Sequence, residues 1–463
     1  MADMLYRSTR GEAGSVSFQE VLFSGLAPDG GLYIPEVLPK YDASFRSSMV
    51  EMSYEEVAFA VLKPFVGSCF SDQELNTIIN EAYSEFRKSD KCDMVNLSEN
   101  HKILELFHGP TFAFKDFAMQ MIARMFHQAL KNIRKSITII VATSGDTGAA
   151  AVHAFRNLEF VNLYVLFPKD RISEIQRRQM TTENASNVSV VSVDGNFDDC
   201  QSIVKSIFKD KDFSKAVSLT GVNSINWARI ISQVVYYSFA ASRLPASAII
   251  DFCVPTGNFG NIYAGYVAKK LGVNIDKLII ATNQNDILHR TLSSGHYRKG
   301  EVLQTFSPSM DIQVSSNFER MLYEVYQCDA KIVIKKMESL QLNGSYDIEE
   351  DSLRILRNNF VSGAVTEAET LAEIKKIFMH SKMIICPHTA VGTKVSRKFL
   401  DEKKITISLA TAHPAKFGDA VEKAISRKIV LPKSLDALFY KEEKVVEAPN
   451  DVNYLKDFIR REQ

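Results

Sequence analysis

The chain has 463 residues, of which 46% are hydrophobic and 24% charged, an ordinary composition for a globular protein of two or three domains. Lysine plus arginine equals aspartate plus glutamate at 55 each, so no net charge favours nucleic acid or a membrane surface. The six cysteines form no CxxC pair, the opening residues have no apolar signal region, and no apolar stretch is long enough for a membrane span. These features predict a cytoplasmic protein with reduced thiols and without a metal site.

The first 95 residues differ in pattern from the rest of the chain. A turn cluster lies at 27–31, helical periodicity runs over 53–88, and the sequence becomes polar near 88–99. We therefore expect a small helical N-terminal unit over residues 1–95 and a larger core over 96–463.

From about residue 100, β-branched apolar runs alternate with helical patterns, which predicts an α/β fold of parallel sheets covered by helices on both faces. The expected strands lie at 136–142, 161–167, 188–193, 248–254, 277–281, 383–386 and 405–409. Helices are expected at 146–155, from about 172, and at 198–208, 261–271, 389–400 and 418–426. In such folds ligands bind at the carboxyl ends of the strands.

Lys115 lies in the run His108–Asp116, among apolar and aromatic residues just ahead of a helical stretch. Burial lowers the pKa of a lysine, and a neutral amine can form a Schiff base with an aldehyde such as pyridoxal phosphate (PLP). The alternative is that Lys115 extends towards solvent and pairs with Asp116.

Two glycine-containing loops follow expected strands and precede helices. The loop at 254–261 (VPTGNFGN) could present backbone amides to a phosphate, although it could also be an ordinary strand-to-helix turn. The loop at 143–148 (TSGDTG) could bind a second anion, or Ser144 or Asp146 could simply cap the next helix.

A third loop, 409–417 (LATAHPAKF), follows the last expected strand. The hydroxyl of Thr411 could hydrogen-bond a pyridine nitrogen. His413 is either a simple turn residue or takes part directly in the chemistry. Asn226 and Arg229, on either side of the single tryptophan, could bind phosphate or serve packing alone.

Together these segments resemble threonine synthase, in the longer branch found in many bacteria and fungi, over nearly the whole chain. The similar stretches are YRSTRG, GLAPDGGLYIPE, HGPTFAFKDF, TSGDTGAAA, VPTGNFGN, NSINWARI, SPSMDIQVSSNFER and ATAHPAKF. The resemblance implies two open, mostly parallel twisted sheets in interleaved α/β subdomains, the tryptophan synthase β-like PLP fold. It also implies conversion of O-phospho-L-homoserine and water into L-threonine and phosphate.

The resemblance also implies residue roles. Lys115 is expected to be the Schiff-base lysine and proton carrier, with Phe114 near the cofactor ring, Thr411 at its nitrogen and Asp146 near its phenolic oxygen. The cofactor phosphate is expected at Gly257, Asn258, Phe259, Gly260 and Asn261. Candidates for binding the substrate are Thr143, Ser144, Thr147, Asn226 and Arg229.

Three alternatives to the synthase remain open. A threonine-synthase-like branch cleaves the phosphorylated substrate to a 2-oxo acid, and its motifs are the same. A serine or threonine dehydratase would share the lysine and the glycine loop but would not need the N-terminal unit. A PLP-binding protein without turnover is the non-enzymatic alternative. We expect a monomer or a homodimer that binds neither nucleic acid nor membrane.

Overall fold

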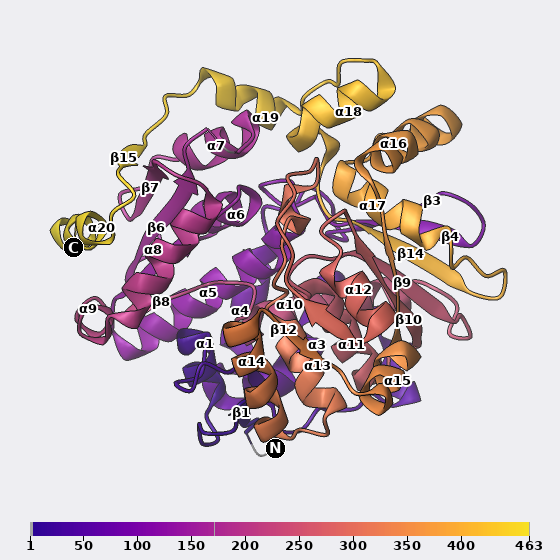
Figure 1. Cartoon of the computed structure of the whole chain (residues 1–463), viewed down its shortest axis with the longest axis horizontal. Coiled ribbons are helices and arrows are strands. Elements are labelled where there is room, and N and C mark those ends of the chain that lie inside the picture. The colour runs from indigo at the N-terminus through magenta and orange to yellow at the C-terminus, as the bar shows by residue number, and fades with distance from the viewer. Residues whose placement is uncertain (1–2, 171, 463) are drawn as a thin grey trace.

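Two large sheets organise the chain, and the computed structural model describes residues 3–170 and 172–462 (Figure 1). The five-stranded sheet is entirely parallel, in the order β15 (Val446–Ala448), β7 (Val188–Val193), β6 (Val161–Pro168), β5 (Ile137–Ala142) and β8 (Leu219–Thr220). The six-stranded sheet has the order β13 (Phe360–Ala364), β10 (Ile275–Thr282), β9 (Ile250–Pro255), β14 (Ile405–Ala410), β4 (His101–Glu105) and β3 (Asp93–Asn96). Only β3 in that sheet is antiparallel to its neighbour. The expected fold class is confirmed.

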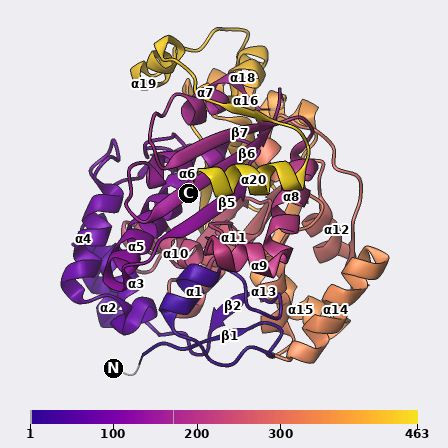
Figure 2. The same cartoon turned by 90° about the vertical axis from the view of Figure 1, so that its left-hand side faces the viewer.

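Both faces of the five-stranded sheet are buried, which explains its unbroken apolar strands. In β5, Ile139 and Val141 belong to the main core, on the side of helix α6 (Asp146–Phe155). Ile140, between them, packs in a separate cluster with α8 (Phe197–Lys209) and α20 (Val452–Arg461). Figure 2 shows α20, in yellow, lying across the face of this sheet. The C-terminal segment therefore returns to a sheet whose other strands end near residue 220.

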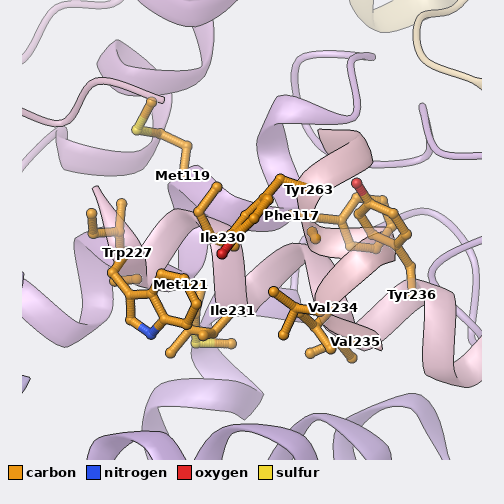
Figure 3. Close-up of a cluster of buried hydrophobic side chains, with 14 of the residues drawn as sticks. Phe117, Met119, Met121, Trp227, Ile230, Ile231, Val234, Val235, Tyr236 and Tyr263 are labelled. Atoms are coloured by element: carbon orange, nitrogen blue, oxygen red, sulfur yellow. The ribbon is translucent and has the colours of Figure 1, made fainter. Parts of the chain in front are cut away.

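The main core is built on three helices, α5 (Lys115–Ile133), α10 (Trp227–Ser242) and α11 (Gly260–Leu271). Figure 3 shows their side chains interdigitating. The labelled residues are Phe117, Met119, Met121, Trp227, Ile230, Ile231, Val234, Val235, Tyr236 and Tyr263, all fully or almost fully buried. Close packing of this kind resists displacement of the backbone. The first residues of α5 and α11, which carry Lys115 and the 254–261 loop, therefore start from a rigid support.

The N-terminal segment packs directly on this core. It contains the antiparallel pair β1 (Tyr6–Ser8) and β2 (Tyr33–Pro35) and the helices α1 (Phe18–Ser24), α2 (Ala43–Ser48), α3 (Tyr54–Val66) and α4 (Asp72–Tyr83). Helix α3 packs against α10, and α4 against α5. Arg10 forms an ion pair of 3.0 Å with Glu319 of α13 (Phe318–Val325). The boundary at residue 95 stays a prediction, and β3 of the large sheet spans it.

Most expected elements appear within a few residues of their expected limits, but the segment 383–386 is not a strand. It is irregular and leads into α17 (Pro387–Ser396), which packs on β9, β10 and β14. The strands of the two large sheets that were not expected from the sequence are β3, β4, β8, β13 and β15. The remaining helices include α7 (Glu174–Thr181), α9 (Lys211–Ala216), α12 (Ile287–Ser294), α14 (Ala330–Asn343), α15 (Glu350–Asn359), α16 (Glu367–Ser381), α18 (Gly418–Ile425) and α19 (Lys433–Asp436). No helix in the described ranges is long and apolar enough to cross a membrane.

Candidate active site

Lys115 is the first residue of α5, and its side chain is only 11% exposed. Its Nζ donates a hydrogen bond of 3.2 Å to the hydroxyl of Ser309 and lies 3.9 Å from a carboxylate oxygen of Asp146. Burial lowers the pKa of Lys115 to about 8, although the charge of Asp146 acts in the opposite direction. An appreciable fraction of this lysine is therefore a neutral nucleophile near neutral pH.

Asp116 does not pair with Lys115, so that alternative is wrong. Its carboxylate accepts bonds from the backbone N–H of Thr111 at 2.8 Å and from the Thr111 hydroxyl at 2.6 Å. These bonds hold the 108–116 loop closed beneath the start of α5. On the other side, the N–H of Phe114 donates to the carbonyl of Thr411 at 2.8 Å. The lysine loop and the 409–417 loop are therefore joined through their backbones.

Asp146, at the start of α6, is buried and strongly bonded. Its Oδ1 receives the ammonium of Lys416 at 2.8 Å and the amide of Gln176 at 2.9 Å, and its Oδ2 faces Lys115. Burial raises the pKa of Asp146, but Lys416 and Lys115 more than offset this and hold the pKa below its ordinary value. Gly145 (φ +129°) precedes it because a Cβ there would meet Gln176 at 2.4 Å. The carboxylate is thus ionised and fixed in orientation.

The loop 256–261 joins β9 to α11 at the carboxyl end of the strand. A Cβ on Gly257 would lie 2.7 Å from the carbonyl oxygen of Ser309, so only glycine allows this approach. Phe259 is held in the left-handed region at φ +63°, unusual for a bulky residue. Asn317 fixes the turn by donating from its backbone N–H at 3.1 Å and its side-chain amide at 2.9 Å to the Asn258 carbonyl.

These residues fit a PLP phosphate. The loop leads into the N-terminus of α11, where backbone N–H groups lack helical partners and favour an anion. Asn261 accepts two tyrosine hydroxyls at its Oδ1, from Tyr236 at 2.6 Å and Tyr237 at 2.8 Å. Its Nδ2 is buried and has no hydrogen-bond partner in the described part of the chain. Residues 256–261, here called the cradle, offer together with Lys115 and Thr411 the groups that a PLP enzyme needs.

The candidates for substrate contact divide into two groups. Ser144 and Thr147 are half-buried at the start of α6, in the same loop as Asp146. The Thr143 hydroxyl instead accepts the N–H groups of Gly145 at 2.9 Å and Gly148 at 2.8 Å, so it shapes that loop.

Asn226 and Arg229 are buried and have protein partners. Asn226 caps α10 through its Oδ1 and donates to the Leu22 carbonyl at 2.9 Å, which ties α10 to α1. Arg229 donates to the Val222 carbonyl at 3.1 Å, while its Nε has no partner among the described residues. Burial lowers the pKa of Arg229 to about 10.

Sequence reasoning did not assign roles to three residues of this site: Ser309, His388 and Lys416. Ser309 and Lys416 lie within the motifs SPSMDIQVSSNFER and ATAHPAKF, and His388 lies at the start of α17, just after the segment 383–386. The imidazole of His388 accepts the Ser309 N–H at its Nε2 at 3.3 Å, and burial lowers its pKa to about 4. Its remaining ring nitrogen, Nδ1, is buried and unpartnered in the part of the chain that the structure describes. His413, in contrast, caps the next turn by accepting the Ala415 N–H.

A possible metal-ligand group lies at the edge of the six-stranded sheet, where none was expected. One ligand atom each of Asp93, Glu105 and His108 lie within 4.8 Å of one another. Lys88 already pairs with Asp93 at 2.7 Å, and His108 bonds to Glu105 at 2.9 Å. These contacts account for the cluster without an ion.

The fold and this constellation define a class, the PLP-dependent enzymes of fold type II. The family model for pyridoxal-phosphate-dependent enzymes matches residues 102–410, and models for the N terminus and C-terminal part of threonine synthase match 5–83 and 389–459. The threonine synthase of Pseudomonas aeruginosa is 42% identical, with 98% of each chain covered.

Solved structures agree. A PLP-bound threonine synthase from Brucella melitensis shares 47% identity over 99% of each chain, with a TM-score of 0.97. The yeast threonine synthase shares 39% identity over 99% of this chain and 98% of its own, with a TM-score of 0.94. The chain belongs to the threonine synthase family and is a PLP-dependent lyase.

Proposed function

We propose that this protein converts O-phospho-L-homoserine and water into L-threonine and inorganic phosphate, with Lys115 as the residue that binds the cofactor and carries protons. The observation that supports it most directly is a buried, partly neutral lysine between Ser309 and Asp146, beside a glycine loop suited to phosphate. The full-length similarity to threonine synthases supports the choice of substrate.

Bound PLP supplies an aldehyde and an electron-withdrawing ring. With cofactor and substrate bound, the free amine of Lys115 would be positioned to remove a proton from the substrate and later to return one. Ser309, at hydrogen-bonding distance, holds that amine in place between these steps. Asp146 keeps a negative charge near it, which stabilises the protonated lysine.

The remaining roles follow the same proposal. Phe114, Gly257, Asn258, Phe259, Gly260, Asn261 and Thr411 bind the cofactor, and Ser144 and Thr147 are the most accessible candidates for the substrate phosphate. Thr143, Asn226 and Arg229 contribute by shaping the loops that border the site, as their protein contacts indicate. The absence of any disulfide among the six cysteines, all within the described ranges, is consistent with a cytoplasmic location. The proposal holds for a monomer or a homodimer.

The test is end-point analysis of PLP-loaded protein incubated with O-phospho-L-homoserine. Threonine and phosphate in equal amounts are expected. Phosphate with a 2-oxo acid and no threonine would place the protein in the phospho-lyase branch. No phosphate release, with the cofactor bound, would contradict catalysis on this substrate.

A further inference from the structure

Lys416 lies on the short helix that follows β14, and its ammonium is fully buried. It makes two contacts at 2.8 Å, one with Oδ1 of Asp146 and one with the carbonyl of Thr111. Lys416 thus connects the 108–116 loop, which contains Lys115, with the 143–148 loop, which contains Asp146. A buried ammonium is costly unless it is paired, so a merely structural position would be better served by an apolar side chain.

The division of the Asp146 oxygens is the informative feature. Oδ1 is occupied by Lys416 and Gln176, whereas Oδ2 is directed to Lys115 at 3.9 Å, beyond hydrogen-bonding distance. The carboxylate therefore has a permanent counter-charge that is not the reactive lysine. If Lys115 were its only cationic partner, each loss of the Lys115 proton would leave a buried, unpaired carboxylate.

We propose that Lys416 is a positioning residue that acts through Asp146: it carries the permanent counter-charge of the carboxylate, so that Lys115 can gain and lose its proton without leaving a buried charge unpaired. This inference rests on the proposed function of Lys115 as the reactive amine. The contact with Thr111 serves the same end, because Thr111 also bonds to Asp116 directly after Lys115.

The direction of the effect follows from the charges. Burial disfavours the protonated form of Lys115, as do the positive charges of Arg229 and Lys416, whereas the negative charge of Asp146 favours it. Replacing Lys416 by methionine removes one cation and frees Asp146 to pair with Lys115 alone. Lys115 then stays protonated to higher pH and becomes a poorer nucleophile.

The experiment measures Lys115 itself and needs no turnover. Full-length protein stripped of PLP is labelled with trace acetic anhydride across a pH series, and mass spectrometry quantifies acetylation of the peptide containing Lys115. In the native chain the labelling midpoint is expected near pH 8, the pKa that burial gives this lysine. In Lys416→Met we expect the midpoint to rise by about one pH unit or more, with at least roughly fivefold less labelling at pH 8.

Two further variants keep the test decisive. The double variant Asp146→Asn, Lys416→Met carries neither of the two charges beside Lys115. The labelling midpoint of Lys115 should therefore return to the native value or below. Lys404→Met is the matched control, because Lys404 pairs with the buried Asp251 at 3.6 Å and with Asp276, in a different part of the fold. It should lower thermal stability without changing the labelling of Lys115.

An unchanged Lys115 midpoint in Lys416→Met would overturn the proposal, whatever the stability of that variant. A failure of the proposed function would look different, since a protein that makes no threonine could still show the shifted titration. If Lys416→Met alone does not fold, the comparison of Asp146→Asn with the double variant decides. Removing Asp146 alone should lower the midpoint, because Lys115 and Lys416 then share no counter-charge.

Discussion

The hydroxyl of Ser309 accepts a hydrogen bond from Lys115 at 3.2 Å, although the two residues are 194 positions apart in the chain. Ser309 lies on a short 3₁₀ turn (Pro308–Met310), and its carbonyl is the atom closest to a Cβ built on Gly257. Its N–H is bonded to His388. Ser309 thus sets the relative positions of Lys115, the glycine loop and α17.

Replacing Ser309 by alanine should therefore weaken catalysis more than stability. One hydrogen bond of this kind contributes about 1 kcal/mol, which corresponds to roughly a fivefold to tenfold loss in kcat/KM. Steady-state kinetics and thermal unfolding together measure this. Ser48→Ala is the control, since Ser48 is exposed on α2 and its hydroxyl donates to the Phe45 carbonyl of the same helix at 2.7 Å. Equal losses in both variants would contradict a specific role for Ser309.

Lys115→Ala should abolish both turnover and the visible absorption of lysine-bound cofactor while retaining the fold. The side chain is buried but small changes at a helix start are tolerated, so circular dichroism should match the native protein. Lys169→Ala, at an exposed lysine paired with Glu447, should leave activity unchanged. Appreciable threonine formation by Lys115→Ala would show that another group carries the protons.

Gly257→Ala tests the cradle. The new methyl group would lie 2.7 Å from a backbone oxygen, so one of the two loops must move, at a cost of about 1–3 kcal/mol. If the cradle binds the cofactor phosphate, PLP affinity should fall by about tenfold to a hundredfold. Titration of stripped protein with PLP, followed by fluorescence, measures this. Gly14→Ala is matched, because a Cβ there meets nothing within 4 Å. Native affinity in Gly257→Ala would remove the cradle from the binding site.

The strands that sequence reasoning found are those buried on both faces. β5, β6, β7, β9, β10 and β14 are apolar and β-branched, and each has a neighbour on both sides. β13 escaped detection because it is an edge strand with the sequence FVSGA, inside a polar region. The apolar segment 383–386 was wrongly predicted to be a strand, because its local pattern is that of a buried strand. The places beside β9 and β10 are taken by β14 and β13, and the segment instead leads into α17, which packs on the face of these strands.

The parts of the site that could be predicted from the sequence are those that depend on local backbone structure. A lysine at a helix start and glycine loops after strands follow from local pattern. The contact between Lys416 and Asp146 does not, because the two residues come from different sheets, 270 positions apart. Nor does local pattern distinguish a buried Arg229 bonded to a carbonyl from one that meets substrate. Such contacts depend on how the two sheets face each other, which periodicity does not encode.

A stability prediction concerns His101, on β4. Its Nε2 contacts the hydroxyls of Ser408 at 2.9 Å and Ser396 at 3.1 Å, and burial, aided by Arg397, lowers its pKa to about 4. The unfolded chain takes up a proton below about pH 6.5, while the folded protein does so only near pH 4. The unfolded state therefore binds more protons between these values, and stability falls as the pH falls through that window.

For His101 this amounts to about 2 kcal/mol at pH 5 and levels off near 3 kcal/mol below pH 4. Urea denaturation at pH 7.5 and pH 5 should show a smaller difference in unfolding free energy for His101→Gln than for the native protein. The glutamine amide can still bond to the two serines, so stability at pH 7.5 should change little. His380→Gln, at an exposed histidine on α16, is the control and should keep the native difference. If His101→Gln also keeps it, the acid sensitivity arises from other groups and His101 is not held neutral in the folded state.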